Sequence, residues 1–550
     1  MVVSTAKQLD STYQLWKRFT YPSPNGPTDA IAVPKLVGDQ LNSTYSVIIE
    51  MALVHVWSIL FGIVLYLYMR RRGMDVSKLS PLAPTIWNKR ADLVDLIRET
   101  VTFSATNWRS PAVPLFLLLV LVAWVGQTAT GILVPPHILL GNAAPVNPEA
   151  IYVPDSSNEG LVSSATLFPL EVPRFIRALG STAVDEELRQ KVNVSAANSV
   201  GQTSDGQDIL RIDYSYRATG VDFGLQRFPD LTLNVAGSCI TDYGWFIFTR
   251  LTISDNVAVA VDYYDVFGLV ETVSLFDGRE PVARFYLGNF TQGTLATSNA
   301  TWAAVVSSVN RTSFSPGTDP WYLTGPALES ATGAQYAVRT ARPVLSCWQD
   351  DVWSYQGHNS TIDALTSNAL PGLELSDSLQ IVLNSILGSP MIEAVGQHLQ
   401  ASALQSTLTA SAQVFDAEVS SVHNDLERLV QAAYVATVNC LTDLTLYPTG
   451  AERQLRNIAR GPSGQIEDGV AEFVVWSPDV TAVSTVVVII IPTVFLGAWL
   501  VAIVLLYWTP VKAVTALDSN VLQQRLKSDE SHETVETSAT IPQSGTSGTQ

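Results

Sequence analysis

Two short acidic stretches beside aromatic residues come nearest to a catalytic site in this sequence. They read DYYD at Asp262–Asp265 and WQDDVW at Trp348–Trp353. Glycosidases and sugar-binding surfaces use paired carboxylates next to aromatic rings, because the rings stack on the sugar and the carboxylates bind its hydroxyl groups or protonate the leaving oxygen. A strand with acidic residues on its wet face and aromatic residues on its dry face gives the same letters. The pattern therefore does not by itself indicate an enzyme.

The common local signatures of catalysis and metal binding are absent from the sequence. It contains no Gly-x-Ser-x-Gly, His-Glu-x-x-His, P-loop or Cys-x-x-Cys motif. The histidines outside the apolar stretches and the tail are His137, His358, His398 and His423, and no two are spaced to share a metal on one helix face. We therefore expect no cofactor and no metal site.

The composition is typical of a membrane protein. Mean hydropathy is +0.20, with 47% hydrophobic and only 15% charged residues, which is high for a soluble protein. Three uncharged stretches, Met51–Met69, Pro111–Val134 and Val480–Val511, are long enough to cross roughly 30 Å of hydrocarbon. The sequence predicts transmembrane helices at residues 47–69, 111–134 and 480–508.

The distribution of charge predicts the orientation of these helices, because basic residues near a span are retained in the cytosol. Residues 70–110 carry eight basic and four acidic side chains, beginning with Arg70, Arg71 and Arg72. Residues 135–479 carry 17 basic and 37 acidic side chains, a net charge of 17 − 37 = −20. We expect the loop 70–110 in the cytosol and the acidic segment outside it.

This orientation places the N-terminus outside the cytosol and the C-terminus inside it. The arm 1–46 contains no visible cleavable signal peptide and is expected to be weakly ordered, so the first span serves as a signal-anchor. The tail 509–550 is polar and is expected to be disordered. The predicted location is the plasma membrane or another secretory-pathway membrane, with several passes.

Six Asn-x-Ser/Thr sequons agree with this topology. They are predicted N-glycosylation sites, and all fall in segments assigned to the extracytoplasmic side: Asn42, Asn193, Asn289, Asn299, Asn310 and Asn359. The acidic segment 135–479 holds all three cysteines, Cys239, Cys347 and Cys440. An oxidising lumen would pair two of them. Cys239 and Cys347 are favoured, because Cys440 lies on the apolar stripe of a predicted helix.

The predicted fold is a membrane-anchored α+β protein whose ectodomain has an antiparallel β-rich half at 135–370 and a helical half at 371–479. In the first half, Leu210, Ile212, Tyr214 and Tyr216 alternate with polar residues, which is typical of a half-buried strand. Asp277-Gly278 is expected to form a hairpin turn.

In the helical half, Ser376 and Ser389 are expected to begin helices, the latter followed by Pro390 at the first helical position. An apolar stripe predicts a long helix at about residues 412–443, which would either pack in its own domain or form a coiled coil between chains.

Two further features belong to the membrane region. Between the first two spans, Trp87, Leu93, Val94, Ile97 and Val101 are expected on the apolar side of an amphipathic helix, which would lie along the inner leaflet or bind a partner. Within the spans, His55 and Gln127 lie at similar depth. A hydrogen bond between these two residues, the intramembrane polar pair, would stabilise the packing of the first two helices by about 0.6–2 kcal/mol.

The sequence thus favours an integral membrane glycoprotein of unknown biochemical function, most simply a non-catalytic surface protein that binds, senses or anchors. One alternative is a membrane-tethered enzyme acting on extracellular glycans or lipids, and another is an accessory subunit of a membrane complex. The expected partners are the lipid bilayer and an extracellular ligand or protein, with no nucleic acid. The oligomeric state is not determined by the sequence.

Overall fold

The computed structural model of the chain divides it into two compact units. Met1–Pro34 and Asn142–Ala482 form one, the domain unit, whereas Lys35–Gly141 and Val483–Gln550 form the other, the helix unit. The residues whose structure is described are 11–71, 87, 92–98, 101, 112–154, 164–254, 257–274, 282–288, 299–308, 311–327, 333–408, 410, 414–447, 454–461 and 463–507.

The domain unit is a mixed α/β structure with mostly antiparallel sheets. Its main sheet has eight strands, six of them in the order β13 (Val282–Leu287), β14 (Asn299–Ser307), β18 (Val344–Tyr355), β9 (Thr232–Asp242), β8 (Asp208–Thr219) and β6 (Val192–Val194). β19 (His358–Ser360) pairs with β18, and β7 (Asn198–Gln202) pairs with β8.

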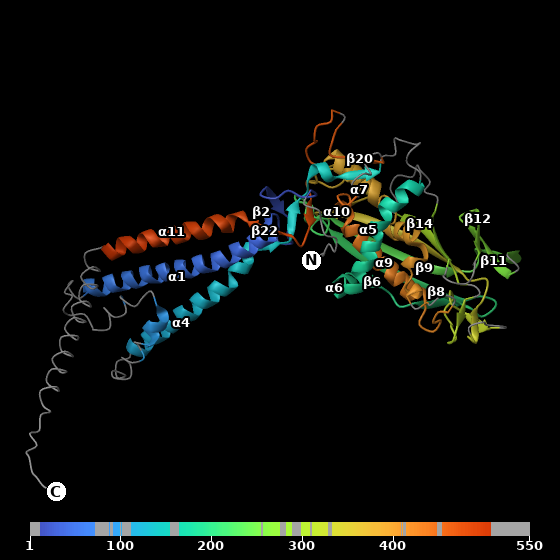
Figure 1. Ribbon diagram of the computed structural model, residues 1–550, viewed down its shortest axis with the longest axis horizontal. Coiled ribbons are helices and arrows are strands. Elements are labelled where there is room, and N and C mark those ends of the chain that lie inside the picture. Colours follow the sequence, from blue (N-terminus) through green and yellow to red (C-terminus); the bar gives the residue numbers. More distant parts are fainter. Residues whose placement is uncertain are drawn as a thin grey trace, which may run out of the picture. The chain divides into compact units, whose positions relative to one another are not determined.

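Helices cover one face of this sheet (Figure 1). They are α5 (Ser164–Val184), α8 (Met391–Leu399) and α9 (Val422–Val438). The Tyr216 ring of β8 lies edge-on to Tyr434 of α9, with centroids 5.7 Å apart. A Cβ atom on Gly396 of α8 would lie 2.3 Å from the Phe285 ring of β13, so glycine is needed for this close approach.

The alternating pattern of β8 corresponds to a buried and an exposed face. Ile212, Tyr214 and Tyr216 are buried on the helix side, as the sequence predicts, whereas Leu210 is only half-buried. On the same side, Cys239 of β9 and Cys347 of β18 are direct register partners and form a disulfide. This is the pairing favoured by the sequence.

The opposite face of the main sheet is covered at one end by a three-stranded sheet of β10 (Phe246–Ser254), β11 (Val257–Val266) and β12 (Leu269–Ser274). Buried Tyr264, Val266 and Val273 pack there against Ala303, Val305 and Val344 of the main sheet. The remaining strands and helices of the domain unit are β1 (Arg18–Tyr21), β2 (Thr28–Pro34), β4 (Ala143–Pro145), η3 (Pro148–Ala150), β5 (Tyr152–Pro154), α6 (Glu186–Arg189), β15 (Thr312–Ser313), β16 (Thr324–Pro326), β17 (Tyr336–Val338), η4 (Ile362–Ala364), α7 (Asp377–Leu387), η5 (Gln400–Ala403), η6 (Gln405–Thr407), α10 (Cys440–Asp443), β20 (Leu455–Asn457), β21 (Val474–Trp476) and β22 (Val480–Ser484), which ends beyond the unit boundary.

The long helix predicted at residues 412–443 is shorter in the structure. It begins at Val422, because the Ser421 hydroxyl caps it by accepting from Asn424 N at 3.1 Å and the distant Asp319 carboxylate accepts from Val422 N at 3.0 Å. Its Leu426 and Leu429 are fully buried inside the domain. The stripe therefore packs in its own domain and is not a coiled-coil surface.

Two further helix starts can be compared with the prediction. The Ser376 hydroxyl caps α7 as predicted, but α8 begins one residue later than predicted, with Pro390 as its N-cap.

The prediction of a weakly ordered arm at 1–46 is wrong for the part of the arm that the structure describes. β1 pairs with β2, and Phe19, Ala30 and Ala32 are buried, so apolar side chains hold this segment in the domain.

The helix unit contains α1 (Lys35–Arg71), α4 (Ala112–Leu133), η2 (Pro135–Ile138), β3 (Leu139–Gly141) and α11 (Thr485–Tyr507). α1 and α11 are joined by a hydrogen bond from the Tyr45 hydroxyl to Val488 O at 2.9 Å and by the His55 and Phe495 rings, 5.7 Å apart. Pro492 lies inside α11.

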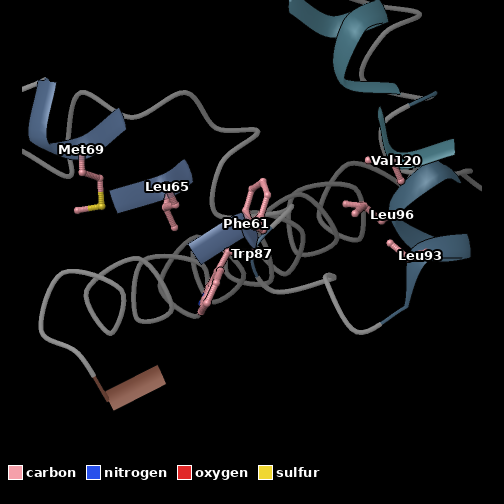
Figure 2. Packing of buried hydrophobic residues seen from close by; sticks show 7 residues of the cluster. All are labelled: Phe61, Leu65, Met69, Trp87, Leu93, Leu96 and Val120. Atoms are coloured by element: carbon pink, nitrogen blue, oxygen red, sulfur yellow. The ribbon is translucent and has the colours of Figure 1, made fainter. Parts of the chain in front are cut away.

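One buried cluster joins the described residues around α1 and α4 (Figure 2). It consists of Phe61, Leu65, Met69, Trp87, Leu93, Leu96 and Val120. Trp87 and Leu93 are buried and Ile97 packs against the cluster, as expected for the apolar side of the amphipathic helix. Val94 and Val101 were expected on the same side, but they are 60% and 46% exposed, so this part of the prediction is wrong. The apolar side contacts α1.

Two helices of the described residues are long and apolar enough to cross a membrane, α1 and α11. A shorter apolar stretch, Val120–Thr130, lies within α4. The pair formed by Asp377–Leu387 and Met391–Thr407, bent by 57°, also passes this test of length and composition. Asp277-Gly278, Trp508 and the tail 509–550 lie outside the described residues, as does most of the loop 70–110.

Candidate functional site

A cavity of about 460 Å³ opens on the surface of the domain unit between α7 and the segment that follows β20. We call it the arginine pocket. It is lined by Ser378 and Ile381 of α7 and by Arg456, Asn457, Ile458, Arg460, Gly461 and Glu467. Its volume is within the range of small-molecule sites.

Backbone pairing fixes the wall that carries the arginines. β20 pairs with β5, so that Arg456 lies opposite Val153. The chain then turns back on itself, with Gly461 N donating to Gln465 O and Glu467 N donating to Ala459 O. Gly464 has φ +75°, a conformation that favours glycine.

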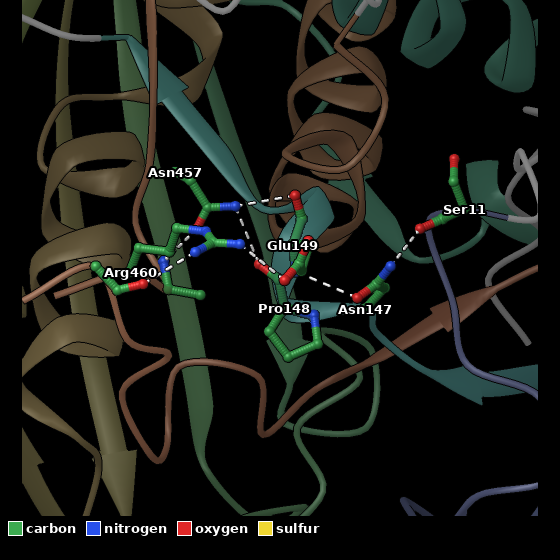
Figure 3. Close-up of polar contacts among 8 residues, drawn as sticks. Ser11, Asn147, Pro148, Glu149, Asn457 and Arg460 are labelled. Atoms are coloured by element: carbon green, nitrogen blue, oxygen red, sulfur yellow. Dashed lines mark hydrogen bonds and ion pairs between the residues drawn. The ribbon is translucent and has the colours of Figure 1, made fainter.

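Asparagine side chains tie this wall to η3 (Figure 3). Asn457 Nδ2 donates to the carbonyl oxygens of Pro148 and Glu149 at 3.2 and 2.9 Å. Asn147 caps η3 by accepting from Glu149 N, and its Nδ2 donates to Ser11 O at 2.7 Å. The pocket wall is therefore held by bonds from three distant parts of the sequence.

The two pocket arginines differ in their contacts. Arg460 donates to Glu149 Oε1 at 2.8 Å and to Gly464 O at 2.9 Å. Arg456 is exposed and makes no hydrogen bond or ion pair with the residues that the structure describes. Across the pocket, Glu467 accepts from the Ser378 hydroxyl at 2.9 Å. Arg456 therefore offers a guanidinium group that can still receive an anion.

Gly461 lies close to Glu467 in the lining of the pocket. A Cβ atom at this position would lie 2.3 Å from Glu467 Oε1, so any larger residue would displace that carboxylate. This site was not predicted from the sequence. Three arginines, Arg453, Arg456 and Arg460, within eight residues of a strongly acidic segment were the signal that could have found it.

The acidic stretch DYYD does not form a carboxylate pair. Asp262 is buried and accepts from Thr249 Oγ1 at 2.7 Å and from Ala341 N at 3.2 Å. Burial raises its pKa. Asp265 is exposed and accepts from Gly268 N in the turn after β11. Both carboxylates have structural partners, and they serve different parts of the fold.

The stretch WQDDVW is also divided by its strand. Asp350 and Asp351 are consecutive in β18 and so point to opposite faces of the sheet. Asp351 accepts from Gln349 Nε2 at 2.8 Å, and burial raises the pKa of Asp351 to about 7. Gln349 in turn accepts from the Tyr214 hydroxyl at 2.8 Å. This is a structural polar network inside the domain.

Comparison with known proteins gives one match. Residues 172–475 match the family model described as a domain of unknown function (DUF8406). The chain belongs to this family. No curated protein matches the chain. No solved structure matches it either. The matched range therefore includes the main sheet, α8, α9, the larger part of α5 and every residue that lines the arginine pocket.

The predicted glycosylation sites are spread over both units. Asn193 in β6 and Asn359 in β19 are exposed in the DUF8406 domain, and Asn299 begins β14. Asn42 is half-buried in α1. Asn289 and Asn310 lie outside the described residues.

The remaining predicted site residues have local structural contacts. Cys440 is a free, buried cysteine at the start of α10, and burial raises its thiol pKa to about 12. His55 lies in α1 against Phe495, and Gln127 lies in α4. Their hydrogen bond stays a prediction. No group of metal-binding side chains occurs within the described ranges.

Proposed function

We propose that this chain is a membrane-anchored glycoprotein whose DUF8406 domain lies on the extracytoplasmic side and binds a small, carboxylate-bearing ligand in the arginine pocket. α1, α4 and α11 are the three spans. The basic loop 70–110 is cytosolic, and the acidic segment 135–479 is not. The disulfide between Cys239 and Cys347 supports an oxidising compartment.

The uncommitted Arg456 guanidinium in the pocket carries the binding proposal. A guanidinium group presents donors in a planar fork that matches a carboxylate. Arg460 adds a second positive charge, although Glu149 already occupies part of it. Ile381, which is 59% exposed, supplies an apolar wall beside these charges. The site combines charge recognition with a surface for the carbon skeleton of a ligand.

The acidity of the domain restricts the number of negative charges that this ligand can carry. The segment that contains the pocket has a net charge of −20, so a polyanion is repelled by the surrounding surface. A single carboxylate is recognised within the pocket, because charges beyond about 8 Å are screened at physiological ionic strength. We therefore infer a small monocarboxylate as the ligand class.

Binding by the purified full chain in detergent micelles tests this proposal. Glucuronate is compared with its uncharged counterpart glucose, and benzoate with benzyl alcohol. Binding of each probe is measured by saturation-transfer NMR and calorimetry. At least one carboxylate is expected to bind where its uncharged counterpart does not. Arg456→Gln is expected to weaken that binding about tenfold or more, because a charged hydrogen bond contributes about 1.5–3 kcal/mol.

Arg217→Gln is the matched control. Arg217 is an exposed arginine of β8 away from the pocket, so its loss changes the net charge of the domain equally. Its affinity for the carboxylate should equal that of the unaltered chain. Equal affinity of Arg456→Gln and Arg217→Gln, or equal binding of charged and uncharged probes, would contradict the proposal.

A further inference from the structure

The uncovered part of the main sheet forms a second surface with its own pattern. Beyond the end covered by β10–β12, residues that alternate with the buried ones point away from the helices. We call this the open face. Trp348 of β18 is 44% exposed and Ile240 of β9 is 37% exposed on it. Arg211 Nε on the same face donates to Asp213 Oδ1 at 3.1 Å and to Ser238 Oγ at 3.0 Å.

Two sequons occupy the ends of one row across this face. Directly opposed residues of antiparallel strands lie on the same side of a sheet. The register gives the row Asn193, Ser215, Ala236, Asp350 and Asn299, through the successive pairs β6–β8, β8–β9, β9–β18 and β18–β14. Because Asp350 and Trp348 are two residues apart in β18, the row belongs to the open face.

A third sequon belongs to the same face. Asn359 of β19 pairs with Ser354 of β18. Ser354 lies an even number of residues from Trp348, and its hydroxyl accepts from Asn234 Nδ2 at 2.9 Å on that side of the sheet. Three of the six predicted glycosylation sites therefore share one side of one sheet.

Each of these asparagines also lies where the sheet has an edge. β6 is the last strand of the main order, and β19 pairs only with β18 among the described strands. Asn299 lies in the part of β14 that precedes its pairing with β13, which covers Trp302–Ser307. Exposed edges invite pairing with other chains, and proteins protect them with bulk or charge.

We propose that N-glycans on Asn193, Asn299 and Asn359 form the outer layer of the open face, covering its apolar residues and closing its edges to other chains. This inference rests on the extracytoplasmic placement of the domain. Asn299 is the diagonal neighbour of Trp348, because Thr301 pairs with Trp348 directly. The open face is a shielded surface, and ligands reach the domain elsewhere.

Site occupancy is the first test. The full chain is expressed in eukaryotic cells, and its peptides are analysed by mass spectrometry before and after glycosidase digestion. Glycans are expected at all three asparagines, and each single Asn→Gln substitution should remove one step of electrophoretic mobility. Asn198→Gln is the control, because Asn198 is exposed in neighbouring β7 but is not in a sequon.

Self-association is the second test. The triple variant Asn193→Gln, Asn299→Gln, Asn359→Gln is expected to form larger assemblies than the unaltered chain in size-exclusion chromatography with light scattering. Adding Trp348→Ser and Ile240→Ser to the triple variant should bring the assembly mass back towards that of the unaltered chain. A role in folding alone would not be rescued by exposed polar substitutions.

The outcomes separate this inference from the proposed function. Glycans at Asn289 or Asn310 with none at Asn193, Asn299 or Asn359 would overturn the shielded face and leave the topology intact. A chain without any N-glycan, digested by protease from the cytosolic side, would overturn both. A triple variant with the same assembly mass as the unaltered chain would contradict the covering role of the glycans.

Discussion

At the scale of single residues, the DUF8406 domain keeps several carboxyl groups buried. Asp425 in the first turn of α9 is fully buried and accepts from Ser406 N at 2.8 Å and from the Tyr322 hydroxyl. Burial raises its pKa to about 6. Glu393 of α8 is also buried, and burial raises its pKa to about 7. At a pH between the ordinary and the raised pKa, these carboxyl groups are protonated in the folded chain and ionised in the unfolded chain.

This burial predicts a domain that is more stable in mild acid than in mild base. Between the ordinary carboxyl pKa and the raised one, the folded state binds more protons than the unfolded state, so the free energy of unfolding falls as pH rises through this interval. Denaturation of the full chain in micelles, followed by tryptophan fluorescence, should show about 1 kcal/mol or more of additional stability at about pH 5 compared with about pH 8.

The variant Glu393→Gln isolates one of these groups, because it keeps the shape and removes the titration. Its stability should change less between the two pH values than that of the unaltered chain. Glu171 works in the opposite direction: burial raises its pKa, but the hydrogen bond from His398 and the charges of Arg174 and His398 together lower it below its ordinary value, so its effect falls below this pH window. Stability that rises from pH 5 to 8 would contradict the prediction.

At the scale of secondary structure elements, one glycine decides how β8 and β9 pack. Tyr214 of β8 accepts from Trp302 Nε1 at 3.2 Å and donates to Gln349, so its ring must lie flat over β9. A Cβ atom at Gly237 would lie 2.2 Å from the Tyr214 ring. The glycine is thus required for the polar network of the core, and not for a turn.

The substitution Gly237→Ala should destabilise the domain by about 1–3 kcal/mol, because the added methyl group displaces a fully hydrogen-bonded ring. Thermal unfolding of the full chain measures this effect. Gly201→Ala in β7 is the matched control, since its Cβ atom would meet only Ile209 Cδ1 at 4.0 Å. Equal melting temperatures of the two variants would show that Tyr214 moves without cost.

The sequence predicted those elements that depend on local patterns, such as the alternation of a half-buried strand or the N-cap of a helix. Alternation located β8, the Ser376 hydroxyl begins α7 as expected, and the position of Cys440 on an apolar stripe left Cys239 and Cys347 as the pair. The start of α9 could not be predicted in this way, because Asp319, about a hundred residues earlier, supplies part of its cap.

The geometry of the arginine pocket could not be predicted from the sequence either, although its cluster of arginines is visible there. Its wall depends on Asn457 reaching η3 and on Arg460 reaching Glu149, contacts that join residues more than three hundred positions apart. The acidic stretches were visible but misleading, since strand alternation separates Asp350 from Asp351. The sequence drew attention to acidic residues that are close together in the chain. The pocket, in contrast, is built from segments that only the fold brings together.

At the scale of the whole molecule, the account depends on the compartment of the DUF8406 domain. Two apolar helices, α1 and α11, flank the domain in the sequence and suggest association with a membrane. The proposed glycan layer requires the domain to lie outside the cytosol, and the disulfide is typical of an oxidising compartment.

Protease protection in sealed microsomes measures this most directly. The full chain, tagged after Gln550, is synthesised with membranes and then digested from outside the vesicles. We predict loss of the tag and survival of a large fragment containing residues 135–479, which shifts to lower mass on glycosidase treatment and disappears when detergent opens the vesicles. Digestion of that fragment in intact vesicles, with survival of the tag, would contradict the account.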